Sequence, residues 1–129
     1  MAVMKAEVLV EKLVRSLDTH KASDIKVLKV TEVTSLADYF VIVGGGSSTQ
    51  VRALADYAEF ELGQQGVSPL RIEGYQTAQW ILMDYGTVVV HVFKEETRQF
   101  YDLEHLWRDG QEMDLNSFLE NGGQDNEKV

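Results

Sequence analysis

Residues 73–93 restrict the fold of this chain more than any other stretch, because they carry the pattern of two strands joined by a tight turn. Residues 79–83 are apolar after the first position, and residues 88–93 are β-branched or aromatic apart from one histidine, as in buried strands. Residues 84–87 are turn formers, and Gly86 adopts a positive φ at little cost. We therefore predict a β-hairpin. Where other elements leave this hairpin uncovered, a functional site is expected.

The segments before the hairpin alternate between helical and strand patterns. Residues 3–18 are predicted to form an amphipathic helix, which either packs on the protein's own sheet or binds a partner. Short apolar runs predict strands at residues 24–30, 37–43 and 70–74. The near-continuous run at 37–43 should be central, and the two lysines within 24–30 are typical of an edge. A second helix should bury a stripe that comprises Val51, Leu54, Ala55, Ala58 and Leu62.

The segments after the hairpin are predicted to be mainly helical. Residues 95–107 should form one helix, and residues 115–119 a weak helical turn. Residues from 122 onward have the composition of a disordered acidic tail. The order of elements predicts an α/β (α+β) fold, with a mixed sheet of about five strands flanked by helices. We divide the chain into a domain at residues 1–110 and a short helical turn with a disordered acidic tail at residues 111–129.

The composition excludes several classes of protein. The 129 residues hold no cysteine, which rules out disulfides, thiolate zinc sites and thiol nucleophiles. No apolar run approaches the ~20 residues of a membrane-spanning helix, and no secretory signal pattern is present, so we expect a cytoplasmic protein. The formal net charge of −9 disfavours a protein that grips nucleic-acid phosphates by itself. The same charge fits either plain solubility or association with a basic partner.

The glycine-rich segment Gly44–Ser48 lies between a predicted strand and a predicted helix, where backbone N–H groups favour an anion. Neither phosphate-binding motif is complete, because no Gly-Lys-Ser/Thr follows and position 49 is threonine in place of the last glycine of Gly-x-Gly-x-x-Gly. A nucleotidyl-transfer site would also need paired carboxylates for two metal ions, and the chain contains no Asp-x-Asp. The segment is therefore either a tight strand-to-helix turn or an unusual nucleotide-binding loop.

Other patterns of catalytic or metal-binding residues are weak. The histidines are His20, His91 and His105, and no pair of them has the spacing of metal ligands on a helix. His91 lies among valines in a predicted strand, where a hydrogen-bonded structural role is favoured over that of a general base. Glu73 and Asp84 could approach each other, but nothing else indicates paired-acid catalysis. We predict no catalytic residue, no metal and no cofactor.

Alternation along the first hairpin strand separates two sets of side chains. Trp80, Leu82 and Asp84 project to one face, and Ile81 and Met83 to the other. One face must belong to the core. If no helix covers Trp80, it is an exposed aromatic residue beside acids, as in the anchor of a protein interface; otherwise it lies under a helix. The alternation alone leaves both possibilities open.

The chain resembles the ribosomal silencing factor family, also called Iojap-like, over about residues 5–110. The resemblance rests on separated motifs that agree in order and spacing, at residues 37–48, 73–86, 90–93 and 98–107. In the second motif, an acidic residue and a glycine precede Trp80 by a spacer of five residues. The departures are mild: three successive glycines begin at Gly44, and Ala78 stands where the family often has glycine.

This resemblance implies a fold similar to the nucleotidyltransferase superfamily without its catalytic acids, and a role without catalysis. It implies binding to the large ribosomal subunit through its ribosomal protein fourteen, on the face that meets the small subunit. Joining of the subunits would then be blocked, and translation would fall when nutrients are short. A homodimer is implied for the free protein, and neither a membrane nor a specific nucleic-acid sequence is expected as a partner.

The family pattern also implies which residues bind the partner. Trp80 is the best candidate for an interface anchor, with Glu73, Asp84 and Tyr85 as its neighbours. The other matching positions are each either structural or in contact with the partner, and they are His91, Arg98, Tyr101, Glu104 and Trp107. Two further hypotheses stay open, a nucleotide-binding or nucleotidyltransferase-like enzyme that uses Gly44–Ser48, and a dimer module with no ribosomal role.

Overall fold

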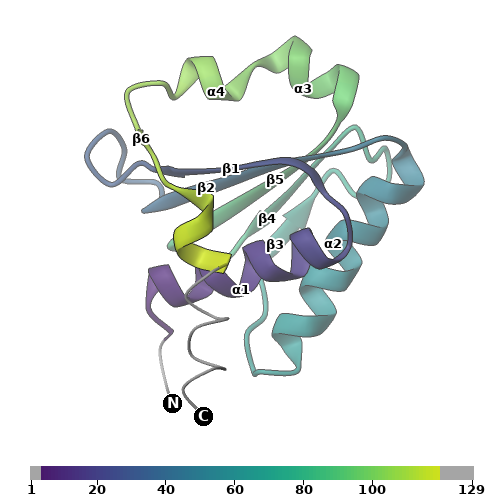
Figure 1. The fold of residues 1–129 in the computed structure, drawn as a ribbon. Helices are drawn as coiled ribbons and strands as arrows, with labels where there is room; N and C mark the ends of the chain where they lie inside the picture. Colours follow the sequence, from purple (N-terminus) through teal and green to yellow (C-terminus); the bar gives the residue numbers. More distant parts are fainter. Residues whose placement is uncertain (1–3, 120–129) are drawn as a thin grey trace.

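The computed structural model describes residues 4–119, which form one sheet with helices on both of its faces (Figure 1). The strands are β1 (Ser23–Lys29), β2 (Tyr39–Gly45), β3 (Arg71–Glu73), β4 (Trp80–Asp84), β5 (Val88–Lys94) and β6 (Gln111–Glu112). They lie in the order β3-β4-β5-β2-β1-β6. β2 and β5 are parallel neighbours, and the other neighbouring pairs are antiparallel. Within residues 4–119, no helix has the length and apolar composition to cross a membrane.

The predicted α/β class is confirmed, and the sheet has six strands rather than about five. The additional strand is β6, which has only two residues and pairs with the end of β1. Because both of its residues are polar and exposed, no apolar pattern marks it in the sequence. β2 is central, as predicted, and β1 has only the short β6 on its outer side.

The predicted hairpin is confirmed as β4 and β5. Asp84 Oδ1 accepts a hydrogen bond of 2.8 Å from the N–H of Gly86. The N–H of Tyr85 donates to the carbonyl oxygen of Val88 at 2.9 Å, and Gly86 has a φ of 90°. β5 pairs with β4 on one side and with β2 on the other. The hairpin therefore lies in the interior of the sheet, with β3 outside it.

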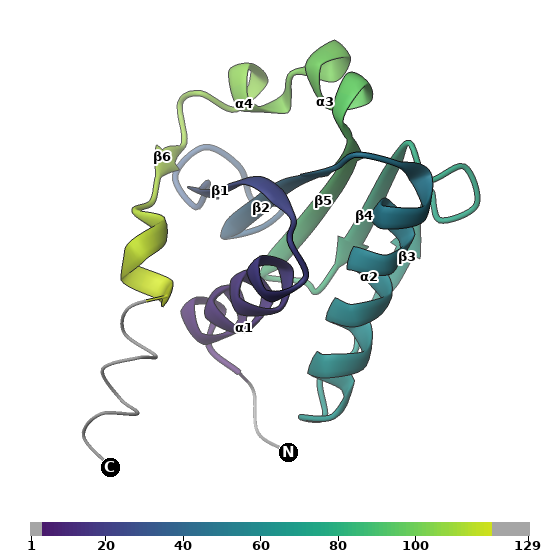
Figure 2. The ribbon, with the colours of Figure 1, turned by 45° about the vertical axis from the view of Figure 1, so that its right-hand side comes forward.

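Two long helices, α1 (Ala6–Thr19) and α2 (Ser48–Gly63), cover one face of the sheet (Figure 2). The predicted stripe of α2 is buried at all five positions. Ser47 caps this helix, because its Oγ accepts a hydrogen bond of 3.1 Å from the N–H of Gln50. The apolar stripe of α1 belongs to the same core, so α1 packs on the protein's own sheet. Burial of both stripes is what holds this layer in place.

Two short helices, α3 (Glu95–Tyr101) and α4 (Leu103–Leu106), lie over the opposite face. The prediction of a single helix over 95–107 is wrong, because Asp102 takes a left-handed conformation with a φ of 50° and interrupts it. Leu103 is buried against the sheet, whereas Phe100 is 81% exposed and Leu106 65% exposed. The break turns Leu103 inward, and it leaves apolar side chains of the same segment facing solvent.

The last described residues return to the α1 side of the sheet. Residues 115–119 form the predicted helical turn, and Phe118 is buried in the core that α1 and α2 cover. Arg15 Nη2 donates to the carbonyl oxygens of Phe118 and Leu119, at 3.3 and 3.0 Å. The disordered tail predicted from residue 122 lies outside the described residues, and the division of the chain at residue 110 stays a prediction.

Candidate partner-binding face

The face of the sheet beneath α3 and α4, hereafter the α3–α4 face, carries Trp80 and several other side chains of the family motifs. The cross-strand pairs of the hairpin on this face are Trp80–Phe93, Leu82–His91 and Asp84–Val89. α4 covers the β1 and β2 side of the face, where Leu28, Phe40 and Leu103 are buried together. Over β4 the cover is incomplete, because Trp80 and Leu82 are only partly buried. The question that the alternation left open is thereby answered: Trp80 is neither sealed in the core nor free on the surface.

Trp80 is held in place by three other rings. Its indole stacks on Phe93 with ring centroids 4.9 Å apart. The ring of Tyr101 in α3 is tilted against the indole, and the two ring centroids are 5.0 Å apart. The indole N–H donates a hydrogen bond of 3.1 Å to Nδ1 of His91. The one polar group of the side chain is therefore satisfied within the protein, and what Trp80 presents to solvent is hydrocarbon.

His91 is buried on this face at 5% exposure. Burial lowers the pKa of its imidazole from 6.5 to about 4, so the ring is neutral at neutral pH. Because Nδ1 accepts from Trp80, the ring proton is assigned to Nε2. Nε2 is buried and has no hydrogen-bond partner among the described residues. His91 therefore serves as a neutral acceptor for Trp80 and not as a charged group.

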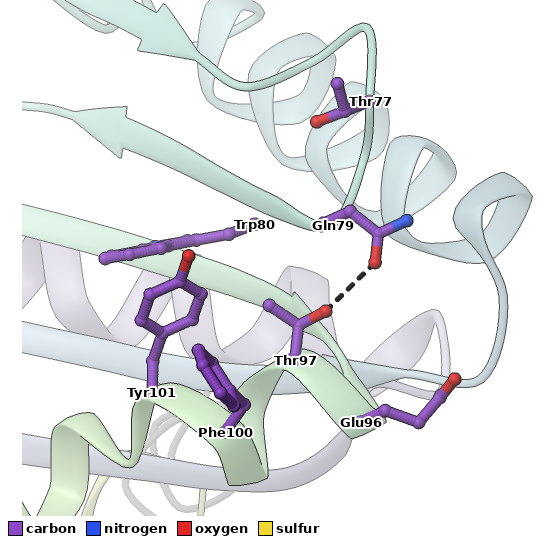
Figure 3. Close-up of a pocket in the computed structure, with 7 residues that line it drawn as sticks. All are labelled: Thr77, Gln79, Trp80, Glu96, Thr97, Phe100 and Tyr101. Carbon is purple, nitrogen blue, oxygen red and sulfur yellow. Dashed lines mark hydrogen bonds between the residues drawn. The ribbon is translucent and has the colours of Figure 1, made fainter.

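Two hollows adjoin Trp80. The first has a volume of about 440 Å3 and lies between the start of β4 and α3 (Figure 3). Figure 3 shows Phe100 and Tyr101 rising from α3 toward the indole of Trp80. Thr97 Oγ1 donates a hydrogen bond of 3.0 Å to Gln79 Oε1 and ties α3 to the start of β4. Trp80 forms a wall of this hollow.

The second hollow, hereafter the apolar pocket, lies over the middle of the hairpin and has a volume of about 290 Å3. Its lining is mainly apolar and includes Leu36, Phe40, Trp80, Leu82, His91 and Trp107. Leu36 is 73% exposed at its margin. A hollow with apolar walls and exposed apolar residues around it is typical of a protein-binding surface.

Charged side chains from β3 and β4 lie at the margin of this face. Arg71 pairs with Glu73 at 3.3 Å and with Asp84 at 3.4 Å. Glu73 and Asp84, which the sequence suggested could approach each other, each pair with the same arginine and are not in direct contact in the described ion pairs. The side chain of Glu73 is 57% exposed, which leaves it accessible to a partner.

Tyr85 is the one predicted neighbour of Trp80 that the structure places elsewhere. It is 9% exposed and belongs to the core covered by α1 and α2. Burial raises the pKa of its hydroxyl well above the ordinary value. The alternation that separates Trp80 from Ile81 also separates it from Tyr85, so the sequence contained the signal for this placement.

Arg98 and Glu104 pair with each other instead of facing outward. Arg98 is 7% exposed, and its Nε donates to Glu104 Oε2 at 2.9 Å. Its Nη1 donates to the carbonyl oxygen of Ser23 at 3.4 Å, and Asp24 lies 3.7 Å from its Nη2. These contacts tie α3 and α4 to the start of β1. Arg98 therefore fixes the two helices over the sheet. The last predicted site residue of α3, Tyr101, is 50% exposed beside Trp80.

Polar groups of the Gly44–Ser48 segment form hydrogen bonds within the protein. The N–H of Gly46 donates to Gln50 Oε1 at 2.7 Å, and Ser47 Oγ is engaged as the helix cap. A Cβ on Gly44 would lie 2.7 Å from Ser23 Oγ, and one on Gly45 would lie 3.0 Å from a methyl group of Val51. Close packing thus explains Gly44 and Gly45 without a phosphate. No group of three or more His, Asp or Glu side chains in residues 4–119 could hold a metal ion.

The sequence prediction did not include several residues of the α3–α4 face. Leu36 and Phe100 are exposed apolar side chains that line the two hollows, at 73% and 81% exposure, and Leu106 of α4 is 65% exposed. Leu36 is an apolar residue that follows a mainly polar connection, and this contrast was the available signal. Phe100 and Leu106 lie in the segment predicted as one helix, and that prediction did not indicate their exposure.

Comparisons with known proteins agree with these features. A family model described as "Ribosomal silencing factor during starvation" matches residues 3–129. A Halalkalibacterium halodurans protein named Ribosomal silencing factor RsfS is 36% identical over 116 residues, which are 90% of this chain and 99% of that protein. A mouse protein named Mitochondrial assembly of ribosomal large subunit protein 1 is 34% identical over 76% of this chain and 44% of its own length. A Chromobacterium violaceum crystal structure has a TM-score of 0.78 and 35% identity, over 81% of this chain and 87% of that one.

Proposed function

This chain belongs to the ribosomal silencing factor family, and we propose that it binds the large ribosomal subunit and prevents the small subunit from joining. Translation is then repressed when nutrients are limited. We place this activity in the cytoplasm. The name of the mouse relative, which refers to assembly of the ribosomal large subunit, supports the large subunit as the partner.

The observation that carries the proposal is the α3–α4 face, where Trp80 stands partly exposed between two hollows. Aromatic side chains beside an apolar hollow are the usual anchors of protein interfaces. The margin of the face carries Glu73 and Asp84, and the chain has a net charge of −9. Ribosomal proteins are basic, so charge of this sign accelerates association with them. We propose ribosomal protein fourteen of the large subunit as the protein that this face contacts.

The mechanism we propose is occlusion, which needs no bond to be made or broken. An interface of standard size covers about 800 Å2 on each partner. A bound domain of this size excludes any second body from the same patch, so the small subunit cannot dock. Tyr101 and His91 contribute to the interface by supporting Trp80, and Arg98 with Glu104 holds α3 and α4 over the sheet. Tyr85 belongs to the core on the opposite side of the sheet and is not part of the proposed interface.

We also propose that the protein is not an enzyme and that the free protein is a homodimer. The occupied amide of Gly46 weighs against the nucleotidyltransferase alternative, because an anion bound there would have to displace the Gln50 side chain. Isothermal titration with nucleotides and magnesium tests this, and micromolar binding would support the enzyme. Sedimentation equilibrium of the free protein tests the dimer, and a mass of one chain would exclude it.

Co-sedimentation tests the main proposal directly. Purified large subunits are incubated with the protein and then challenged with small subunits before separation on a sucrose gradient. We expect the protein to travel with the large subunit and the fraction of joined ribosomes to fall as its concentration rises. If the protein stays at the top of the gradient, or the subunits join undiminished, the proposal is wrong.

A further inference from the structure

The apolar pocket beside Trp80 is shaped before any partner arrives. Trp80 is fixed by its hydrogen bond to His91 and by its stacking on Phe93. On the opposite wall, Trp107 packs edge-to-face against Phe40 with ring centroids 5.1 Å apart. Rigid aromatic walls lose little entropy when a ligand enters, so a preformed pocket of this kind binds more tightly than one that must be assembled.

The floor of the pocket selects against charged groups. Leu82 and Val89 are aliphatic, and His91 is neutral because burial lowers its pKa to about 4. Nε2 of His91 is a buried donor without a hydrogen-bond partner in the described residues. An ionised group placed against these aliphatic walls would lose part of its hydration, and the charged residues that line the pocket, Arg71 and Asp84, are already paired with each other. An uncharged occupant avoids this cost.

The margin of the pocket, in contrast to its floor, favours charged groups on a partner. Arg71 and Asp84 belong to its lining, and Arg71 also pairs with Glu73. Two carboxylates against one guanidinium leave an excess of negative charge at this edge, in a chain of net charge −9. Basic side chains are therefore favoured next to the pocket, although not inside it.

We propose that the apolar pocket is a subsite for one uncharged aliphatic or aromatic side chain, which a basic protein partner projects between residues that face Glu73 and Asp84. The inference rests on the proposed function, because it describes how the same face grips its partner. It identifies the partner's anchor by chemistry: an apolar side chain flanked by Lys or Arg, complementary to Trp80 across the interface.

Two substitutions that act in different ways test the subsite. Leu82→Trp fills the pocket from its floor. Leu36→Gln replaces the apolar side chain at its mouth with an uncharged polar one, at a position where the native side chain is 73% exposed and tolerant of change. Binding to purified large ribosomal subunits is measured by co-sedimentation. We expect each variant to bind at least about tenfold more weakly than the unaltered protein. Phe60→Ala is the matched control, because Phe60 of α2 is 65% exposed on the other layer of the molecule.

The outcomes separate the subsite from the proposed function. If the unaltered protein does not bind large subunits, both ideas fall together. If Trp80→Ala weakens binding but Leu36→Gln and a folded Leu82→Trp bind like the unaltered protein, the subsite is excluded and the proposed function stands. Circular dichroism establishes whether Leu82→Trp folds. If it does not, Leu36→Gln decides the question, since the side chain of Leu36 contributes little to the core.

Discussion

The indole N–H of Trp80 donates a hydrogen bond of 3.1 Å to Nδ1 of His91, which joins the two strands of the hairpin on the α3–α4 face. The bond runs diagonally, because the residue directly opposite Trp80 is Phe93 and the residue opposite His91 is Leu82. It fixes the orientation of the indole and requires a neutral imidazole. The side chain we assign as the anchor is thereby oriented by a buried histidine.

Trp80→Ala should weaken binding to the large subunit while leaving the domain folded. By precedent for aromatic anchors, the loss should be about 2 kcal/mol or more in binding free energy, roughly thirtyfold in affinity. Trp80 is partly exposed, so the core beneath α1 and α2 is untouched. Trp80→Phe keeps most of the apolar contact and should lose less. Co-sedimentation of the purified variants with large subunits measures both, and equal binding of Trp80→Ala would remove it as the anchor.

Mild acid should destabilise the folded protein through His91. The pKa of this group is lowered from 6.5 to about 4 in the folded state, so between these values the unfolded chain binds a proton that the folded chain excludes. The free energy of unfolding must then fall as the pH decreases through this window, by roughly 3 kcal/mol at its lower end. Urea unfolding at several pH values measures the effect.

The control for this pH dependence is a pair of histidine variants. In His91→Leu, the free energy of unfolding should lose the part of its pH dependence that arises from His91 between pH 6.5 and about 4. His105→Leu should keep it, because His105 is exposed on α4. Carboxylates titrate alike in all three proteins, so the difference between them isolates the buried group. Parallel slopes in the two variants would contradict the assignment.

Arg98→Met should destabilise the protein strongly. Arg98 Nε is 2.9 Å from Glu104 Oε2, with side chains 9% and 25% exposed, so removal of the guanidinium leaves a carboxylate largely buried without a partner. The expected cost is about 3 kcal/mol in the free energy of unfolding. The double variant Arg98→Met with Glu104→Leu should recover much of it. Thermal unfolding of the three proteins measures this, and a double variant as unstable as the single one would argue against the pairing.

Gly74→Ala should damage both the fold and the anchor, because Gly74 has a φ of 82° and a Cβ there would collide with the carbonyl oxygen of Trp80. Gly66→Ala is a matched control, since Gly66 has a φ of 80° but no atom within 4 Å of the new Cβ. The control should lose about 1–2 kcal/mol from backbone strain alone, and Gly74→Ala clearly more. Unfolding measurements compare the two, and a similar loss in both would show that the contact with Trp80 is unimportant.

Local patterns predicted much of the framework. Alternation placed Trp80 and Ile81 on opposite faces, because a strand has a strict period of two. Helical spacing predicted the buried stripe of α2 correctly, since one apolar side of a helix must meet the core. The turn at Gly86 was predicted because glycine adopts a positive φ at little cost, and its φ is indeed positive. Each of these features depends on residues that are close together in the chain.

The extent of cover over Trp80 was decided by contacts between distant residues. The break at Asp102, the pairing of Arg98 with Ser23 and Asp24, and the two-residue strand β6 together determine where α3 and α4 lie. The break at Asp102 is a local left-handed conformation without a periodic signal, and the other contacts leave none because each joins segments far apart in sequence. The sequence by itself thus determined which side chains of the hairpin share a face with Trp80. Only the tertiary structure determined that α3 and α4 leave part of that face open, because the position of these helices depends on long-range packing.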